Sequence, residues 1–131
     1  MALEFESATV LLQVFDMPTS LRFYCDILGF EKIEGTDDWV YLRRGGIELM
    51  LNTAYESDDR PPRPDPTRIA AHDDTAIYFG CPDVDGAFEH MQAKGWNCTP
   101  PKVAPYGMKQ LYVHDPDGYN LCFQWPEKKS D

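Results

Sequence analysis

The chain has 131 residues, of which 43% are hydrophobic and 13% aromatic, a composition that suits one compact domain with a substantial core. Its formal net charge of −10 argues against a nucleic acid or an anionic membrane as partner, because both require a basic surface. The chain shows no secretory signal, no run of residues suits a membrane span, and the four cysteines form no CxxC pair, so we expect a cytoplasmic protein.

The first half of the chain predicts a strand, a helix and three further strands. Residues 9–14 alternate as a strand does, Asp16 suits a helix N-cap, and Gly29 suits the left-handed end of that helix. Alternating segments separated by glycine-containing turns then predict strands over 31–35, 38–43 and 46–52. The first module therefore has the order βαβββ.

The second half repeats this pattern. Residues 76–80 alternate, Asp83 suits an N-cap, and Gly95 ends the apolar stripe of a second helix. Strands are predicted over 97–102, 109–114 and 119–125, with a strong turn at Asp115-Pro116-Asp117-Gly118. A repeat of this size indicates two joined modules with a site between them.

The predicted organisation is a single domain over 1–131. Module one covers 7–52, a proline-rich linker 53–74, module two 75–126, and a charged tail 127–131. The linker carries Arg60-Pro-Pro-Arg-Pro-Asp-Pro66, and so many prolines exclude a central strand or a helix interior. We expect this segment to be a linker or a flap.

Several motifs resemble the glyoxalase/bleomycin-resistance/dioxygenase superfamily, whose members are also called vicinal oxygen chelate proteins. They are Val14-Phe-Asp16, Ser20-Leu-Arg-Phe-Tyr24 and Leu28-Gly-Phe30 in the first half, and Asp83-Val-Asp85, Lys94-Gly95 and Asp115-Pro-Asp-Gly-Tyr-Asn-Leu121 in the second. The resemblance implies an α+β fold in which two βαβββ modules form a curled sheet with a cup-shaped cavity. It also implies a homodimer, which commonly completes the cup in this family.

The family's metal enzymes take their ligands from strand positions that correspond here to Thr9, Glu48, Ala76 and Cys122. Only Glu48 keeps a ligand type of the family. A catalytic zinc or nickel site needs at least three protein ligands, and a non-haem iron site needs something like two histidines and a carboxylate. We therefore expect no metal or other cofactor; the alternative is one divalent metal, such as Zn, Ni, Fe or Mn, bound partly by Glu48.

The chain resembles the metal-free bleomycin-resistance members in Ala8-Thr-Val-Leu-Leu12, in its long linker and in Pro105-Tyr-Gly107. Those proteins bind and sequester a bulky cationic drug. We therefore predict a homodimeric, metal-independent protein that binds a small organic molecule, cationic or aromatic, with antibiotic or toxin sequestration as one version of this function.

Two alternatives stay open. The first is a metal-dependent lyase or isomerase like glyoxalase I, or a ring-cleaving dioxygenase, with Glu48 as one ligand. The second is an interaction module whose cup is filled by its own side chains. The sequence does not decide whether the protein is an enzyme; we favour a binding protein, and we identify no catalytic residue.

Strand alternation and aromatic content select the candidate ligand-binding residues. They are Thr9, Leu11, Gln13, Trp39, Tyr41, Glu48, Met50, Ala76, Tyr78, Tyr106, Tyr112, Cys122 and Gln124. Glu48 stands on an otherwise apolar strand. Its position predicts one of three roles: an anchor for a cationic ligand, a general base, or one half of an internal salt bridge to Arg43 or Arg44.

Overall fold

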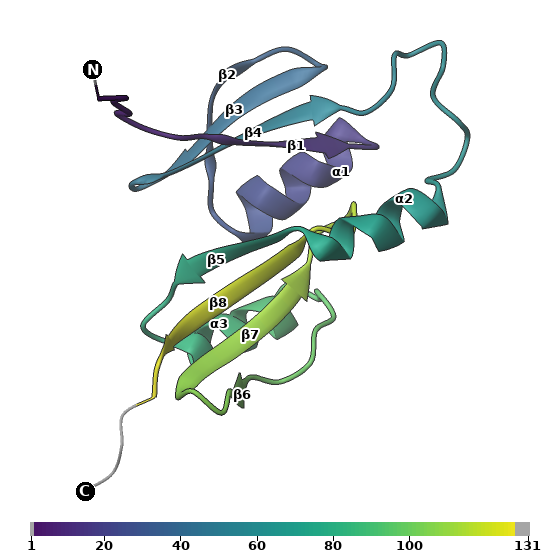
Figure 1. Cartoon of the computed structure of the whole chain (residues 1–131). Coiled ribbons are helices and arrows are strands. Elements are labelled where there is room, and N and C mark those ends of the chain that lie inside the picture. Colours follow the sequence, from purple (N-terminus) through teal and green to yellow (C-terminus); the bar gives the residue numbers. More distant parts are fainter. Residues whose placement is uncertain (1, 128–131) are drawn as a thin grey trace, which may run out of the picture. The chain divides into compact units, whose positions relative to one another are not determined.

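Two four-stranded sheets with the same strand order make up the structure of residues 2–127, a computed structural model (Figure 1). The first sheet has the order β1-β4-β3-β2 and the second the order β5-β8-β7-β6. The chain divides between Arg63 and Pro64 into two compact units, and each sheet lies in its own unit. The predicted α+β fold with two βαβββ modules is therefore confirmed.

Unit 1 begins with β1 (Val10–Val14) and a helix in two parts. Its elements are β1, α1 (Met17–Leu21), a π-helical stretch (Arg22–Ile27), β2 (Glu31–Gly35), β3 (Trp39–Arg44) and β4 (Ile47–Thr53). β1 runs parallel to β4, and the other neighbours are antiparallel. The residues that alternate inward form the core of the sheet: Leu12, Val14, Val40, Leu42, Leu49 and Leu51, all buried.

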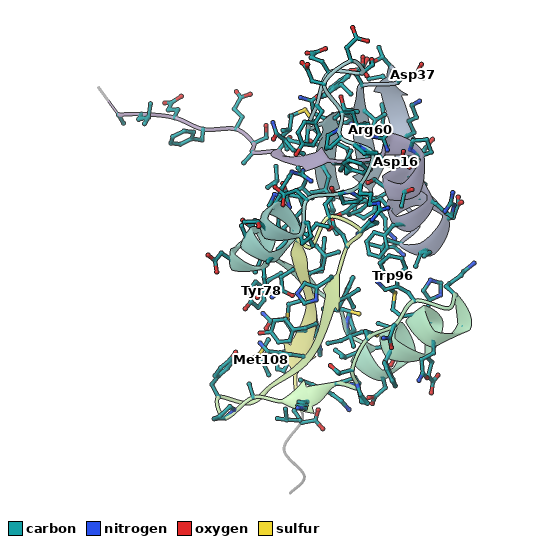
Figure 2. All side chains as sticks on the ribbon, turned by 90° about the vertical axis from the view of Figure 1, so that its right-hand side faces the viewer. Asp16, Asp37, Arg60, Tyr78, Trp96 and Met108 are labelled. Carbon is teal, nitrogen blue, oxygen red and sulfur yellow. The ribbon has the colours of Figure 1, made fainter. Side chains whose placement is uncertain are left out.

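The ends of the first helix follow the predicted signals. Asp16 is the N-cap, and its carboxylate accepts a hydrogen bond from the backbone N–H of Thr19 at 3.1 Å. Arg60 donates to the other oxygen of Asp16 at 2.8 Å, and Figure 2 labels both residues. Gly29 ends the helix with a φ of 82°, which confirms the left-handed termination.

We expect the substitution Asp16→Ala to lower the free energy of unfolding by about 1 kcal/mol, because it removes the N-cap. The hydrogen bond from the Thr19 hydroxyl lowers the pKa of Asp16 most, and the Arg60 contact and the backbone N–H of Thr19 add to this effect. A carboxyl with a lowered folded pKa stabilises the fold above its unfolded pKa, and this contribution disappears as the pH falls through the lowered value. Urea unfolding at neutral and acidic pH measures both effects.

Asp37→Ala is the matched control, because Asp37 is an exposed aspartate that caps no helix. Equal losses for the two variants would contradict the capping role of Asp16.

The proline-rich segment contains a short helix that the sequence did not predict. Residues 54–65 have no regular structure, but α2 (Pro66–Ala71) and a 3₁₀ turn (His72–Asp74) follow. Pro66 stands in the first turn, where its missing N–H costs no hydrogen bond, and the Asp65 side chain caps the helix by accepting from Thr67 N at 2.9 Å. The prolines thus exclude a helix interior, as expected, but they permit a helix that begins at the last of them.

Unit 2 repeats the arrangement of unit 1 after α2. Its elements are β5 (Ala76–Gly80), α3 (Val84–Ala93), β6 (Lys102–Val103), β7 (Met108–His114) and β8 (Asn120–Pro126). α3 packs on β7 and β8 (Figure 1). Buried Phe79, Leu111, Val113 and Leu121 alternate toward the core, and Asp83 and Gly95 bound the helix as predicted.

The strand predicted over 97–102 is wrong. Only Lys102 and Val103 pair, with Gln110 and Lys109 of β7, and residues 97–101 have no regular structure. Pro100 and Pro101 carry no backbone N–H, so this stretch cannot continue a hydrogen-bonded ladder. In the predicted tail, 127–131, the residues from 128 onward lie outside the described part of the chain.

Candidate functional site

One face of each sheet packs on the helix of its unit, and we call the other face the helix-free face. Residues that pair across neighbouring strands lie on the same face. In unit 1 the pairing forms the rows Leu11–Met50–Tyr41 and Gln13–Asn52–Trp39 on the helix-free face, next to Glu48 and Arg43. The candidate residues of unit 1 therefore share one surface, and Thr9, directly before β1, joins it through its contact with Glu48.

Glu48 has several polar partners on this face. Its carboxylate lies 3.4 Å from Nη2 of Arg43 and accepts a hydrogen bond from the Thr9 hydroxyl at 3.4 Å. A hydrogen bond from Tyr41 lowers the pKa of Glu48 most, and the charge of Arg43 lowers it further. The internal salt bridge is therefore confirmed, with Arg43 as the partner. A paired carboxylate with a lowered pKa is a weak general base.

The four family positions do not form a metal donor set in this chain. Ala76 has no donor atom, and Thr9 already donates to Glu48. Cys122 is fully buried, and this burial raises the pKa of its thiol, which favours the neutral form over the thiolate that binds metals. Among residues 2–127, no three His, Cys, Asp or Glu side chains are grouped so that they could hold a metal ion.

The helix-free face of unit 2 brings together most of the second set of candidates. The strand pairing forms the rows Tyr78–Cys122–Tyr112 and Gly80–Gln124–Gln110–Lys102, and Ala76 begins β5 on the same face. Tyr106 lies in the loop before β7 and hydrogen-bonds to Gln110. Aromatic rings and amide groups therefore alternate across this surface.

A groove of about 470 Å³ lies beside these rows. It is lined by residues of the segment 99–106 and by Gln110 and Tyr112 of β7. Pro100, Val103 and Pro105 give it apolar walls, and Tyr106, with 70% of its surface exposed, is its most accessible aromatic ring. The irregular backbone before β6 thus borders this groove.

A hydrogen-bond network fixes the polar groups of the groove. The side-chain amide of Gln110 donates to the Tyr106 hydroxyl and to Oε1 of Gln124, each at 2.9 Å. The Tyr112 hydroxyl donates to Oε1 of Gln110 at 3.4 Å and lies 3.3 Å from the Tyr78 hydroxyl. The hydrogen bond with Tyr78 and burial raise the pKa of Tyr112, so its phenol stays neutral at physiological pH.

Sequence reasoning missed Gln110 and the segment 99–105 as parts of this site. The signal for Gln110 was present, since it stands two residues before Tyr112 and strand side chains alternate. The loop residues had no such signal, because prolines mark a loop without giving its path.

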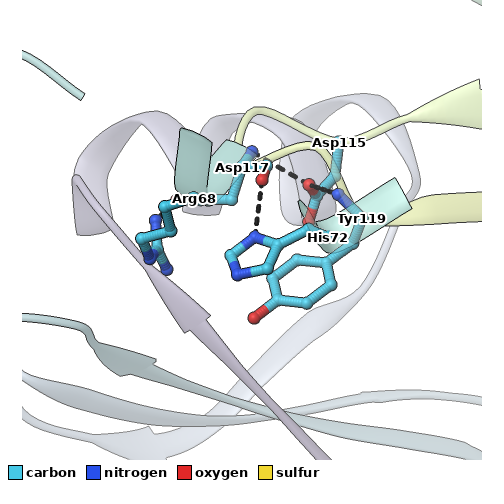
Figure 3. Close-up of polar contacts among 5 residues, drawn as sticks. All are labelled: Arg68, His72, Asp115, Asp117 and Tyr119. Atoms are coloured by element: carbon cyan, nitrogen blue, oxygen red, sulfur yellow. Dashed lines mark hydrogen bonds and ion pairs between the residues drawn. The ribbon is translucent and has the colours of Figure 1, made fainter. Parts of the chain in front are cut away.

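A second polar cluster lies at the turn between β7 and β8 (Figure 3). Oδ1 of the buried Asp115 accepts hydrogen bonds from the backbone N–H groups of Asp117 and Tyr119, both at 2.9 Å. The Asp117 carboxylate pairs with Arg68 of α2 at 2.9 Å. His72 meets the Asp117 carbonyl at 2.7 Å and stacks on the Tyr119 ring at 4.0 Å. These contacts join α2 to the turn, and the polar groups of the cluster bind one another.

Comparisons with known proteins agree with this fold. The sequence model of the Glyoxalase/Bleomycin resistance protein/Dioxygenase superfamily matches residues 7–123. The uncharacterized protein YaeR of Escherichia coli (strain K12) is 32% identical over 120 residues, which cover 81% of this chain and 84% of YaeR.

Solved structures show the same likeness. The bleomycin-binding protein of bleomycin-producing Streptomyces verticillus, solved with copper(II)-bleomycin, is 25% identical with a TM-score of 0.67, covering 98% of this chain and 100% of that one. The bleomycin resistance determinant encoded on transposon Tn5 is 21% identical with a TM-score of 0.71, covering 95% and 100%. None of the helices in residues 2–127 is long and apolar enough to cross a membrane.

Proposed function

Because the chain belongs to the glyoxalase/bleomycin resistance protein/dioxygenase superfamily, we propose that it binds a small organic molecule without a metal ion and without chemical turnover. The groove of unit 2 carries this proposal. Its volume of about 470 Å³ falls in the range of small-molecule sites, and its apolar walls with a few fixed polar groups are typical of such sites.

The chemistry of the groove favours binding over catalysis. Its phenols and its amide are held in a hydrogen-bond network, and neither group type activates a nucleophile at neutral pH. The other polar side chains of its lining are those of Thr99 and Lys102. The nearby thiol of Cys122 is buried and its pKa is raised, so it is a poor nucleophile.

Sequestration of an antibiotic or toxin is the version of this function that the relatives suggest. The solved relatives include one protein in complex with copper(II)-bleomycin, and we extend to this chain only the mode of holding a small ligand. The candidates of unit 1, from Thr9 to Met50, lie outside the lining of this groove and stay predictions. The candidates of unit 2 beyond its lining, Ala76, Tyr78, Cys122 and Gln124, stay proposed contacts of the ligand. A homodimer and a cytoplasmic location stay predictions.

We expect naphthol, a neutral two-ring probe, to bind in the groove of the full chain. In a titration followed by two-dimensional NMR, the backbone amides of Val103, Tyr106, Gln110 and Tyr112 should shift together, because all four residues line the groove. Tyr106→Ala should weaken binding about fivefold, since stacking on one exposed ring contributes on the order of 1 kcal/mol. Shifts confined to other parts of the chain would contradict the proposal.

Tyr41→Ala is the matched control, because Tyr41 is also a tyrosine on a helix-free face but lies in unit 1, outside the lining of the groove. The affinity of the Tyr41→Ala variant for naphthol should equal that of the unchanged protein.

We also expect the protein purified without chelator to contain far less than one divalent ion per chain, since the four family positions do not form a metal donor set. Elemental analysis measures this content, and dialysis against a chelator should leave naphthol binding unchanged. One equivalent of a transition metal that disappears in Glu48→Gln would instead support the lyase or dioxygenase alternative.

A further inference from the structure

The hydrogen-bond network of the groove leaves one hydroxyl donor available to a ligand. The Gln110 amide group has two hydrogens, and they serve Tyr106 and Gln124. Because the Tyr106 oxygen accepts one of them, the hydrogen of its own hydroxyl is left to donate to another group. The hydroxyl belongs to the most exposed ring of the groove, so a bound molecule meets this donor first.

The charge at the groove, like its hydrogen-bond donor, favours a ligand that accepts hydrogen bonds. Lys102 is the only charged side chain among the described residues that line it. Lys102 pairs directly with Gln110 across β6 and β7, so both side chains project from the same face of the sheet. An ammonium group donates hydrogen bonds and accepts none. The protein has a formal net charge of −10, so a cationic lining residue at this groove runs against the overall balance.

We infer that the ligand of this groove is a planar compound that carries an anionic oxygen group, such as an aromatic carboxylate, an assignment that rests on the ligand-binding function proposed above. The anion accepts hydrogen bonds from Lys102 and the Tyr106 hydroxyl. The planar part lies against the tyrosine rings and the proline walls.

The preference of the groove for an anionic ligand therefore differs from the preference for a cationic ligand that Glu48 suggested. Glu48 belongs to unit 1, and its charge is compensated by Arg43 at 3.4 Å. The lining of the groove in unit 2 includes no aspartate or glutamate among the described residues. A cationic ring compound would thus place its charge near Lys102 without a compensating carboxylate in the groove.

Three probes of nearly equal shape test the charge of the ligand: naphthalene carboxylate, its carboxamide and its carboxamidine, which are anionic, neutral and cationic at neutral pH. Each is titrated into the full chain and followed by two-dimensional NMR. The carboxylate should bind about fivefold more tightly than the carboxamide, the usual upper range for an exposed ion pair, and the carboxamidine most weakly. The advantage should shrink as salt is added.

Lys102→Met should weaken the carboxylate much more than the carboxamide and so remove most of the preference for the carboxylate. Tyr106→Phe, which keeps the ring but loses the hydroxyl, should weaken the carboxylate about threefold. Lys32→Met is the matched control, because Lys32 also lies on an edge strand but belongs to unit 1, and it should change neither affinity.

The outcomes separate this inference from the proposed function. If the carboxamide or the carboxamidine binds in the groove as tightly as the carboxylate, or if Lys102→Met has no effect, the anionic assignment is overturned while small-molecule binding stands. If none of the three probes shifts the groove amides, the proposed function itself fails.

Discussion

Gly118→Ala should be among the most destabilising single substitutions in unit 2, lowering the free energy of unfolding by more than about 3 kcal/mol. Gly118 has a φ of 87°, which a residue with a Cβ atom adopts only with strain. A Cβ atom there would also overlap the backbone carbonyl of Ile69 in α2, and a backbone group cannot turn aside as a flexible side chain does. The turn and α2 would have to separate.

Gly95→Ala isolates the contribution of that overlap. Gly95 has a φ of 74°, and an added Cβ would meet nothing within 4 Å. It should therefore cost only the backbone strain, about 1 to 2 kcal/mol. Urea unfolding of both variants measures the difference. Equal losses of unfolding free energy would show that the close approach of Ile69 to the turn does not affect stability.

Asp115→Ala should lower the free energy of unfolding by about 3 kcal/mol or more. Asp115 is 4% exposed, and its Oδ1 accepts two backbone hydrogen bonds at 2.9 Å, from Asp117 and Tyr119. Alanine would leave both N–H groups buried without this acceptor, and hydrogen bonds to a charged group contribute about 1.5 to 3 kcal/mol each. The carbonyl of Asp117 would then no longer be held toward His72.

Asp115→Asn is the matched variant, because the amide keeps an oxygen at the same position but loses the charge. Its loss should be about half that of Asp115→Ala or less, since neutral hydrogen bonds are roughly half as strong as charge-assisted ones. Thermal unfolding monitored by circular dichroism compares the two. An asparagine variant as unstable as the alanine variant would show that the charge, and not the two hydrogen bonds, stabilises the turn.

The fold was predictable where local patterns and tertiary packing require the same residues. Asp16 and Asp83 each cap a helix, and Gly29 and Gly95 end them at positive φ, because these functions need only the chain within one turn. A salt bridge of Glu48 to Arg43 or Arg44 was among the predictions, and the structure selects Arg43, which stands directly opposite Glu48 in the hairpin.

The segments rich in proline were less predictable, for a physical reason. Proline removes a backbone donor and fixes φ, but this rule allows both the helix that starts at Pro66 and the irregular path through Pro100 and Pro101. Whether a helix or an irregular path forms depends on contacts with residues distant in the sequence. For the helix that starts at Pro66, one such contact is the ion pair of Arg68 with Asp117. The groove could therefore not be located from the sequence, although Tyr106 and Tyr112 on its wall were selected.

The measurement that tests the central claim most directly is the position of naphthol bound to the intact chain. Intermolecular nuclear Overhauser effects between the probe and the side chains of Val103, Tyr106 and Tyr112 are the predicted result, because these residues line the groove of unit 2. Saturable binding with such effects only to residues outside the groove, or binding that requires an added divalent metal, would contradict the account.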